Sequence, residues 1–162
     1  MLALKLICVD RMKEPYYRDA FAEYQKRLGA FCRFETVELA EQRAGHGSDP
    51  SEREIAAALE KEAVEIEKQI PAGSVLLAMC VEGTALSSEQ LASQLGAWSA
   101  AGRGRICILI GGSCGLAARL KQRADLRLSL SKMTFPHHLF RVMAAEQLYR
   151  AFTILEGRKY HK

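Results

Sequence analysis

Three short stretches in the second half of the chain combine residue types that could do chemistry. The run RICILI, residues 105–110, leads into the glycine turn GGSCG, residues 111–115. A polar turn, Leu130–Phe135, leads through Pro136 into the last helical pattern, and the chain ends in the basic segment EGRKYHK, residues 156–162. Glycines allow positive φ and close backbone approach, and a few polar groups among apolar ones are typical of ligand pockets. These stretches therefore predict one small-molecule and RNA site.

The glycine turn offers backbone groups rather than a known nucleotide motif. Gly111, Gly112 and Gly115 follow an apolar strand pattern and precede a helix, whose first N–H groups are free to bind a ligand. The turn is not a first-strand GxGxxG fingerprint, and no Walker lysine follows it, so the standard dinucleotide and P-loop interpretations fail. A tight turn that simply needs glycine remains the structural alternative.

The same turn also fits G-x-S-x-G, the nucleophile elbow of serine hydrolases. Ser113 would be the nucleophile, and Asp125 and then His137 or His138 follow in the required order. The chain is short for that fold and shows no separate oxyanion loop, so the hydrolase stays a minor alternative. The simpler interpretation of the two histidines is polar contact at the start of a helix.

The polar turn Leu130–Phe135 suits an adenine ring. Backbone N–H and C=O groups can read the edge of the ring, while Leu130, Met133 and Phe135 cover its face. Pro136 then fixes the exit of the turn and begins the helix.

The basic tail suits RNA. Tyr160 can stack on a base, Arg158, Lys159 and Lys162 can hold phosphates, and His161 titrates near neutrality. Chain termini are often disordered, which is the alternative interpretation of this segment. We interpret the tail as functional because its side chains suit RNA binding.

Charge is divided unevenly along the chain. Residues 1–99 contain 11 Lys and Arg against 16 Asp and Glu, a balance of −5, whereas residues 100–162 contain 12 against 3, a balance of +9. This split predicts that the C-terminal third meets a polyanion, with solvated helix faces as the alternative. No apolar run reaches the roughly 18 residues that cross a membrane, and MLALKLICVD lacks the features of a signal peptide. We expect a cytoplasmic protein without membrane or DNA partners.

Length and composition predict one compact domain spanning residues 1–162, and the order of its strand and helix patterns predicts the α/β class. The chain is 49% hydrophobic, and its five cysteines show no CxxC pair, so neither a disulfide framework nor a zinc knuckle is indicated. Strand and helix patterns alternate along the chain: strands at Leu2–Val9, Arg33–Leu39, Ser74–Val81, Ile106–Ile110 and from Leu126, and helices at Glu14–Leu28, from Ser51, from Ser87 or Ser88 to about Ala101, from about Leu116 to Ala124, and at His137–Leu155. This order predicts a mostly parallel sheet with helices on both faces and ligands beyond the carboxyl ends of the strands. The last helix is apolar on two sides, which predicts a homodimer.

The segments LIGGSCG, SLSKMTFPHHLFRVMAAEQLYRAF and the terminal YHK resemble the SPOUT class of RNA methyltransferases. More narrowly, the whole chain, from the initial KLICVD onward, is similar to the 23S ribosomal RNA (pseudouridine-N3)-methyltransferase family. That resemblance implies a C-terminal trefoil knot, a homodimer, and S-adenosylmethionine as methyl donor, with no metal. The implied cofactor contacts are Met79, Gly111, Leu130, Ser131, Lys132, Met133, Thr134 and Phe135. Ser113 and Cys114 stand where the family usually has Pro-Glu.

Methyl transfer to N3 of a pseudouridine needs orientation and removal of the N3 proton. We expect His161 to assist that proton transfer, Tyr160 to position the base, and Arg141 and Lys162 to favour the developing anion. Because the tail is short, we expect it to complete the site of the partner subunit, with the ribosome or large subunit as substrate. A SPOUT enzyme with another RNA target and a non-catalytic RNA-binding dimer remain the alternatives.

Overall fold

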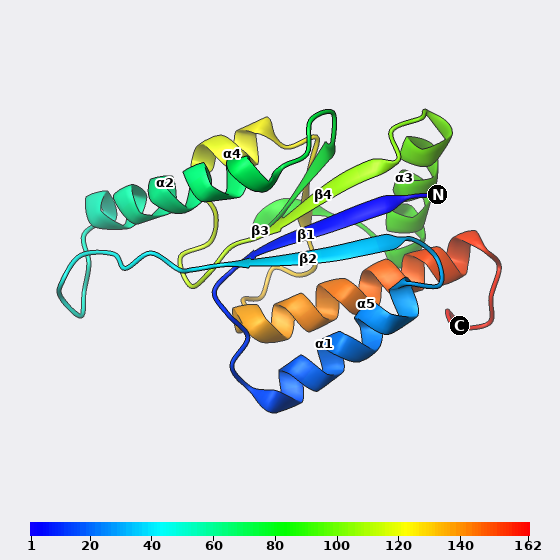
Figure 1. Cartoon of the computed structure of the whole chain (residues 1–162), viewed down its shortest axis with the longest axis horizontal. Coiled ribbons are helices and arrows are strands. Elements are labelled where there is room, and N and C mark those ends of the chain that lie inside the picture. The colour runs from blue at the N-terminus through cyan, green and yellow to red at the C-terminus, as the bar shows by residue number, and fades with distance from the viewer.

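The centre of the molecule is a parallel sheet of five strands (Figure 1), seen in a computed structural model that describes residues 1–162. The strands are β1 (Ala3–Val9), β2 (Arg33–Leu39), β3 (Val75–Ala85), β4 (Arg105–Ile110) and β5 (Leu126–Ser129), in the spatial order β2-β1-β4-β3-β5. The helices are α1 (Pro15–Leu28), α2 (Glu52–Gln69), α3 (Ser88–Ala100), α4 (Ala118–Arg123) and α5 (His137–Leu155). The predicted α/β class with a parallel sheet is confirmed.

Helices cover both faces of the sheet, so the inner strands are apolar on both sides. Leu6 of β1 and Ile108 of β4 point into the larger core, which α1, α3 and α5 close. Their chain neighbours Ile7 and Leu109 point to the opposite face, where α2 and α4 pack. In Figure 1 the two helical layers lie on either side of the strands. At the sheet edge, β2 alternates between half-buried and exposed residues, as its sequence predicts.

Two helices begin at the serine caps that the sequence indicates. The Ser51 hydroxyl accepts a hydrogen bond from the Glu54 N–H, and the Glu54 carboxylate accepts one from the Ser51 N–H at 2.8 Å. Ser87 and Gln90 make the same reciprocal pair at the start of α3. Such capping boxes satisfy two N–H groups that a helix start would otherwise leave free. They fix where α2 and α3 begin.

Strand β3 departs from its predicted end at Val81. It continues to Ala85, with an irregularity that lets Leu128 of β5 pair first with Met79 and then with Thr84. A side chain at Gly83 would lie 2.8 Å from the Arg127 backbone, so glycine permits this close approach. The residues between the two pairings leave the ladder, and this detour turns Cys80 and Glu82 toward the carboxyl end of the sheet. The sequence pattern therefore predicted that the strand ends at Val81, because the residues after the irregularity no longer form an apolar run.

Helix α5 runs along the sheet and presents a half-buried apolar stripe outward. Leu139, Val142 and Met143 are each partly exposed, while Ala144 and Leu148 on the other side are buried. None of the five helices is long and apolar enough to span a membrane. The trefoil knot implied by the family resemblance stays a prediction.

Truncation of a central strand residue should destabilise the fold strongly. Ile108 is 1% exposed, so Ile108→Ala should lower the free energy of unfolding by about 2–5 kcal/mol through lost burial and an added cavity. Val64→Ala, at a position 43% exposed on α2, is the matched control and should change stability by less than about 0.5 kcal/mol. Urea denaturation followed by circular dichroism measures both. Equal effects of the two substitutions would contradict this description of the core.

Candidate active site

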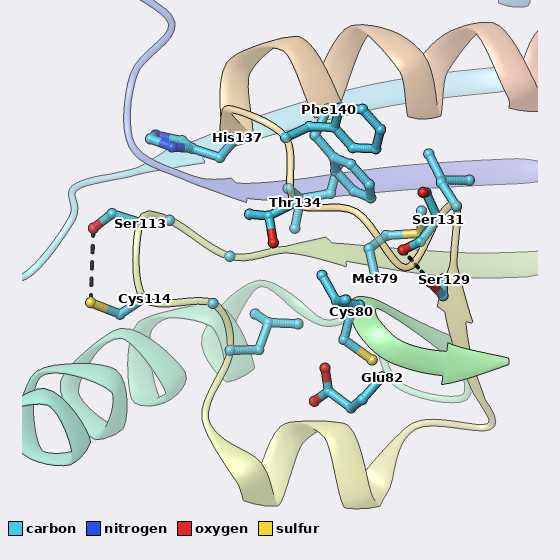
Figure 2. Close-up of a pocket in the computed structure, with 18 of the residues that line it drawn as sticks. Met79, Cys80, Glu82, Ser113, Cys114, Ser129, Ser131, Thr134, His137 and Phe140 are labelled. Carbon is cyan, nitrogen blue, oxygen red and sulfur yellow. Dashed lines mark hydrogen bonds between the residues drawn. The ribbon is translucent and has the colours of Figure 1, made fainter. Parts of the chain in front are cut away.

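A cavity of about 580 Å³ opens at the carboxyl ends of three adjacent strands, β4, β3 and β5 (Figure 2). Its volume lies within the range of small-molecule pockets, roughly 300–1,000 Å³. Three segments line it: residues 79–82 of β3, residues 110–116 at the end of β4, and residues 129–131 and 133–137 at the end of β5, with Lys121 and Phe140. The position agrees with the strand ends that the sequence singled out.

The glycine turn forms one wall, folded tightly on itself. A side chain at Gly111 would lie 2.2 Å from the carbonyl oxygen of Gly115, and Gly115 itself has a φ of +78°. Gly112 and Gly115 form an isolated bridge across the turn. Only glycine fits these positions, so this wall of the pocket is mostly backbone.

Glu41 holds the turn from outside. Its Oε1 accepts hydrogen bonds from the Ser113 N–H at 2.6 Å and from the Ser113 hydroxyl at 2.5 Å. Cys114 is exposed, with its Sγ 3.9 Å from the Ser113 Oγ (Figure 2). A carboxylate from the segment after β2 thus binds the turn at Ser113, the first of the two positions where the family resemblance implies Pro-Glu. Sequence reasoning missed Glu41, because 72 residues separate it from Ser113.

The serine hydrolase alternative is wrong. The Ser113 hydroxyl binds Glu41 rather than a histidine. Asp125 accepts hydrogen bonds from the Leu76 N–H and from Arg103, and no contact joins it to a histidine. The G-x-S-x-G match is therefore a consequence of a glycine turn, and no catalytic triad forms.

The turn after β5 forms the opposite wall and is braced by its own serines. Ser129 donates a hydrogen bond from its hydroxyl to the Ser131 carbonyl at 2.8 Å, and the Ser131 hydroxyl accepts one from the Met133 N–H at 3.0 Å. Met133 is 72% exposed, unusual for a large apolar side chain that lines a pocket. The turn therefore presents an apolar surface to the solvent at the pocket mouth.

The structure brings together almost the whole predicted cofactor set. Met79, Gly111, Leu130, Ser131, Met133, Thr134 and Phe135 all line the cavity. Lys132 is exposed and does not line it. Cys80, Glu82 and Lys121 also line the cavity, although no site role was predicted for them. The only signal was that Cys80 lies near the end of the apolar run Ser74–Val81 and that Glu82 follows it directly.

Glu82 and Lys121 form an ion pair at the edge of the pocket, with Nζ and Oε1 2.5 Å apart. The hydrogen bond from Lys121 lowers the pKa of the Glu82 carboxyl, so this wall carries a carboxylate. Burial raises the pKa of the neighbouring Cys80 thiol, which keeps it protonated and a poor nucleophile.

The predicted catalytic residues of the tail lie outside the cavity of their own chain. The tail folds back along α5, so that the His161 ring contacts Glu89 at 2.7 Å and Arg150 at 3.3 Å. Hydrogen bonds from its own backbone N–H and from His161 lower the pKa of the Glu89 carboxyl to about 2. About 15 Å of helix axis, at 1.5 Å per residue, separates Arg150 from the pocket residue Phe140. His161 does not reach the pocket of its own chain in this arrangement.

Tyr160 is fixed beside His161. Its hydroxyl donates a hydrogen bond to Glu146 Oε1 at 3.0 Å, and the Arg150 guanidinium lies 4.7 Å from the centre of its ring. Burial is the largest cause of a raised pKa for the Tyr160 hydroxyl. Such a hydroxyl stays protonated near neutrality and acts as a hydrogen-bond donor rather than a base.

The three basic residues predicted to bind RNA all lie at the surface. Arg158 rests 4.5 Å from the centre of the Phe31 ring and pairs with Glu156, while Lys159 and Lys162 are exposed. The two lysines are therefore available to an anion.

Arg141 is the predicted site residue that the structure places least favourably for contact with a substrate. It is 1% exposed and donates to Glu38 Oε2 at 2.6 Å and to the Asp10 carbonyl at 2.8 Å. These contacts favour a structural role.

Comparison with known proteins gives this site its class. Residues 2–161 match the model of a family described as "Predicted SPOUT methyltransferase". The Ribosomal RNA large subunit methyltransferase H of Bifidobacterium adolescentis is 46% identical over 99% of this chain and 100% of its own length. The protein of that name from Streptococcus equi subsp. zooepidemicus is 42% identical over the same shares. The chain belongs to the SPOUT methyltransferase family, whose methyl donor is S-adenosylmethionine.

Solved structures agree at the level of the fold. A probable methylase family protein from Haemophilus influenzae superposes with a TM-score of 0.60 at 14% identity, over 100% of this chain and 72% of that one. A probable methyltransferase from Bordetella pertussis gives 0.55 at 15% identity, over 93% and 96%.

A methyl group added at the glycine turn should close the cofactor pocket. Because the Gly111→Ala Cβ would meet the Gly115 carbonyl, the wall must shift, and binding of S-adenosylmethionine should weaken at least about tenfold, or about 1.4 kcal/mol. Gly47→Ala is the control, since a Cβ there meets nothing closer than 4.0 Å. Isothermal titration calorimetry measures the affinities, with circular dichroism to confirm folding. Unchanged affinity in a folded Gly111→Ala protein would place the cofactor elsewhere.

Proposed function

We propose that this protein transfers the methyl group of S-adenosylmethionine to N3 of a pseudouridine in 23S ribosomal RNA. The observation that carries the proposal is that the cavity at the ends of β3, β4 and β5 is lined by all but one of the predicted cofactor residues. The names of the relatives support an RNA substrate of the large ribosomal subunit, because their similarity extends over nearly the whole chain.

The pocket suits a nucleoside with a charged sulfur centre. Leu130 and Phe135 supply apolar cover for an adenine, and the glycine turn 111–115 brings backbone groups within reach of polar edges. The Glu82 carboxylate at the edge adds a negative charge that favours a cation. When bound, S-adenosylmethionine supplies a methyl group already activated by its sulfonium.

The protein then has to hold the reacting atoms in line and take up one proton. Orientation of this kind contributes up to roughly 7–11 kcal/mol in well-placed reactions. His161 is the proposed acceptor of the N3 proton, directly or through a water. Its ring also contacts a carboxylate, that of Glu89, at 2.7 Å, which holds the ring in place. Tyr160, held as a neutral donor by Glu146, positions the base.

A homodimer would bring the two parts of the site together. The outward stripe of α5, with Leu139, Val142 and Met143, is half-buried and apolar, and a symmetric dimer would place the same stripe on both partners. A second hollow of about 590 Å³ adjoins this stripe and shares Leu130 with the cofactor pocket. The tail of one subunit would thus lie close to the cofactor of the other.

The RNA would approach over the basic C-terminal third. That part of the chain has a charge balance of +9, and Lys159 and Lys162 are exposed at its end. The proposed substrate is the assembled ribosome or large subunit in the cytoplasm, where the shape of the particle adds recognition that a small domain lacks.

Incubation with labelled S-adenosylmethionine and undermethylated ribosomes should give about one methyl group per particle. Digestion and mass spectrometry should place it on N3 of a pseudouridine in 23S RNA, and the Gly111→Ala protein should transfer at least about tenfold more slowly at a cofactor concentration below its dissociation constant. Label on another RNA would support the alternative SPOUT target. Absence of transfer to any RNA, with cofactor binding intact, would support the non-catalytic RNA-binding alternative.

Two inactive variants should restore activity when combined. His161→Ala should bind S-adenosylmethionine normally yet transfer slowly, by about 10²–10⁴-fold if it removes the proton acceptor, whereas Gly111→Ala should lack the cofactor. A heterodimer of the two contains one complete composite site, so verified heterodimers should recover up to about half of the wild-type rate. The control is a mixture of the two variant homodimers, each crosslinked between its own subunits so that the subunits cannot exchange. No recovery in verified heterodimers would show that the tail serves the pocket of its own chain.

A further inference from the structure

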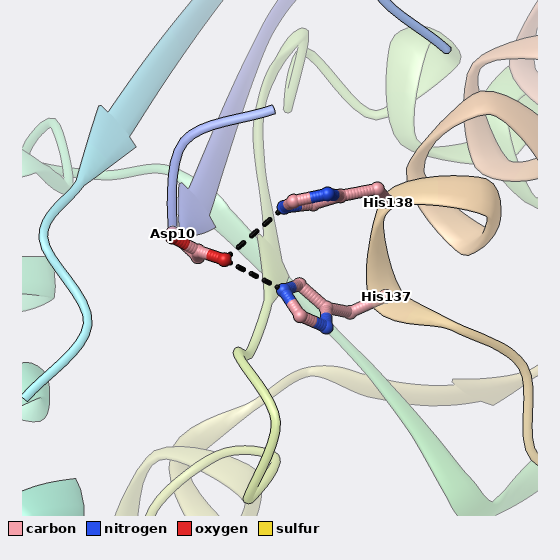
Figure 3. Close-up of side chains that lie close together, drawn as sticks. All are labelled: Asp10, His137 and His138. Atoms are coloured by element: carbon pink, nitrogen blue, oxygen red, sulfur yellow. Dashed lines mark hydrogen bonds and ion pairs between the residues drawn. The ribbon is translucent and has the colours of Figure 1, made fainter. Parts of the chain in front are cut away.

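Two histidines and one aspartate converge at the start of α5 (Figure 3). Asp10 Oδ2 lies 3.0 Å from His137 Nε2 and 3.2 Å from His138 Nε2. Ligands about 2.0–2.1 Å from a tetrahedral zinc ion are separated from one another by roughly 3.3 Å. The two nitrogen–oxygen separations are therefore close to the edges of a zinc coordination tetrahedron.

Hydrogen-bond accounting at His138 calls for a cation. Its Nδ1 lies 2.7 Å from Glu14 Oε2, and a neutral imidazole has only one N–H. If that N–H is on Nδ1, Nε2 has no proton to donate, and two acceptors, Nε2 and Asp10 Oδ2, lie 3.2 Å apart. His138 is 6% exposed, and its Nε2 is buried without a hydrogen-bond partner. A metal ion bound by both atoms, or a second proton on the ring, would relieve this conflict.

Asp10 is held in place from several sides. It is the only residue other than glycine with a positive φ, +76°. Its N–H donates to the Leu39 carbonyl, its own carbonyl accepts from Arg141, and its Oδ1 accepts from the Arg11 N–H. Oδ2 is left to face the histidines. Backbone strain that the surroundings maintain in this way is typical of ligand sites.

We propose that Asp10, His137 and His138 form a binding site for a divalent transition metal of the zinc type. Two imidazole nitrogens and a carboxylate oxygen are ligands that zinc prefers. Glu14 accepts the Nδ1–H of His138 and is its positioning residue, as carboxylates commonly are for metal-bound histidines. The two carboxylates balance the charge of the ion.

The site holds the segment after β1 against the first turn of α5. His137 also lines the cofactor pocket, so an ion here would fix one edge of that pocket. Methyl transfer itself needs no metal. The proposal is therefore independent of the proposed reaction, and it succeeds or fails on metal binding alone.

A proton on His138 would give similar distances, so the experiment has to separate a metal from a proton. The full-length protein, stripped with a chelator, is titrated with Zn²⁺ against a chromogenic competitor and with Co²⁺ in the visible range. One ion per chain and the intense bands of low-coordinate cobalt are expected. The same titrations of the Cys114→Ser variant exclude metal binding by the exposed Cys114 thiol. Less than stoichiometric binding by the wild-type protein would overturn the proposal, with the proton as the bridging cation.

Matched variants locate the ion. His138→Gln and Asp10→Asn should abolish binding, and Glu14→Gln should weaken it by about 10- to 100-fold. His46→Gln, in an exposed loop, should bind as the wild type does. Thermal melts in the presence of chelator establish that each variant folds. If one variant does not fold, the metal affinities of the other ligand variants, including His137→Asn, test the proposal. Retention of wild-type affinity in folded His138→Gln or Asp10→Asn would overturn the proposal.

Discussion

The buried guanidinium of Arg141 is the constraint on which the arrangement of the site depends. It joins α5 to the ends of two strands through Glu38 and the Asp10 carbonyl, and the same Glu38 oxygen accepts the Met12 N–H. The Arg141 side chain is 2% exposed and that of Glu38 is 38% exposed, so loss of Glu38 would leave a buried charge without its ion-pair partner and destabilise the fold. The pair thus sets where α5 begins, and with it the turn that precedes the helix.

From this anchor the pocket is assembled mainly out of backbone. The glycine turn and the turn Leu130–Phe135 face each other across about 580 Å³, each braced by short polar contacts: Glu41 on Ser113, and Ser129 on Ser131. Such rigidity suits a reaction in which the methyl donor is already activated. What remains for the protein is orientation and the handling of one proton.

The groups proposed for that proton and for the RNA base lie apart from the pocket of the same chain. Tyr160 and His161 are held by Glu146 and Glu89, away from the cofactor cavity. This separation is the physical reason for proposing a second subunit. Within one chain, Tyr160 and His161 do not reach the cofactor pocket, so the pocket and the tail would have to come from different subunits. The half-buried stripe of α5 supplies a surface for such pairing.

The sequence by itself determined the elements, because their causes are local. Apolar runs predicted the buried strands, the serine caps predicted the starts of α2 and α3, and the order of strands and helices predicted a parallel sheet with a site at its carboxyl ends. Of the eight cofactor residues that the family resemblance implies, all but Lys132 line the pocket. These features depend on neighbours within a few positions of one another.

Tertiary structure alone decided the contacts between distant segments. The continuation of β3 past Met79 depends on pairing with β5, and the contacts of Glu41 with Ser113 and of Asp10 with His137 join residues 72 and 127 positions apart. No periodicity encodes which loops meet, since packing of the helices on the sheet sets their positions. For the same reason His137 and His138, which the sequence suggests as polar helix-start contacts or as the histidine of a hydrolase triad, form the proposed metal site only because α5 packs against the end of β1.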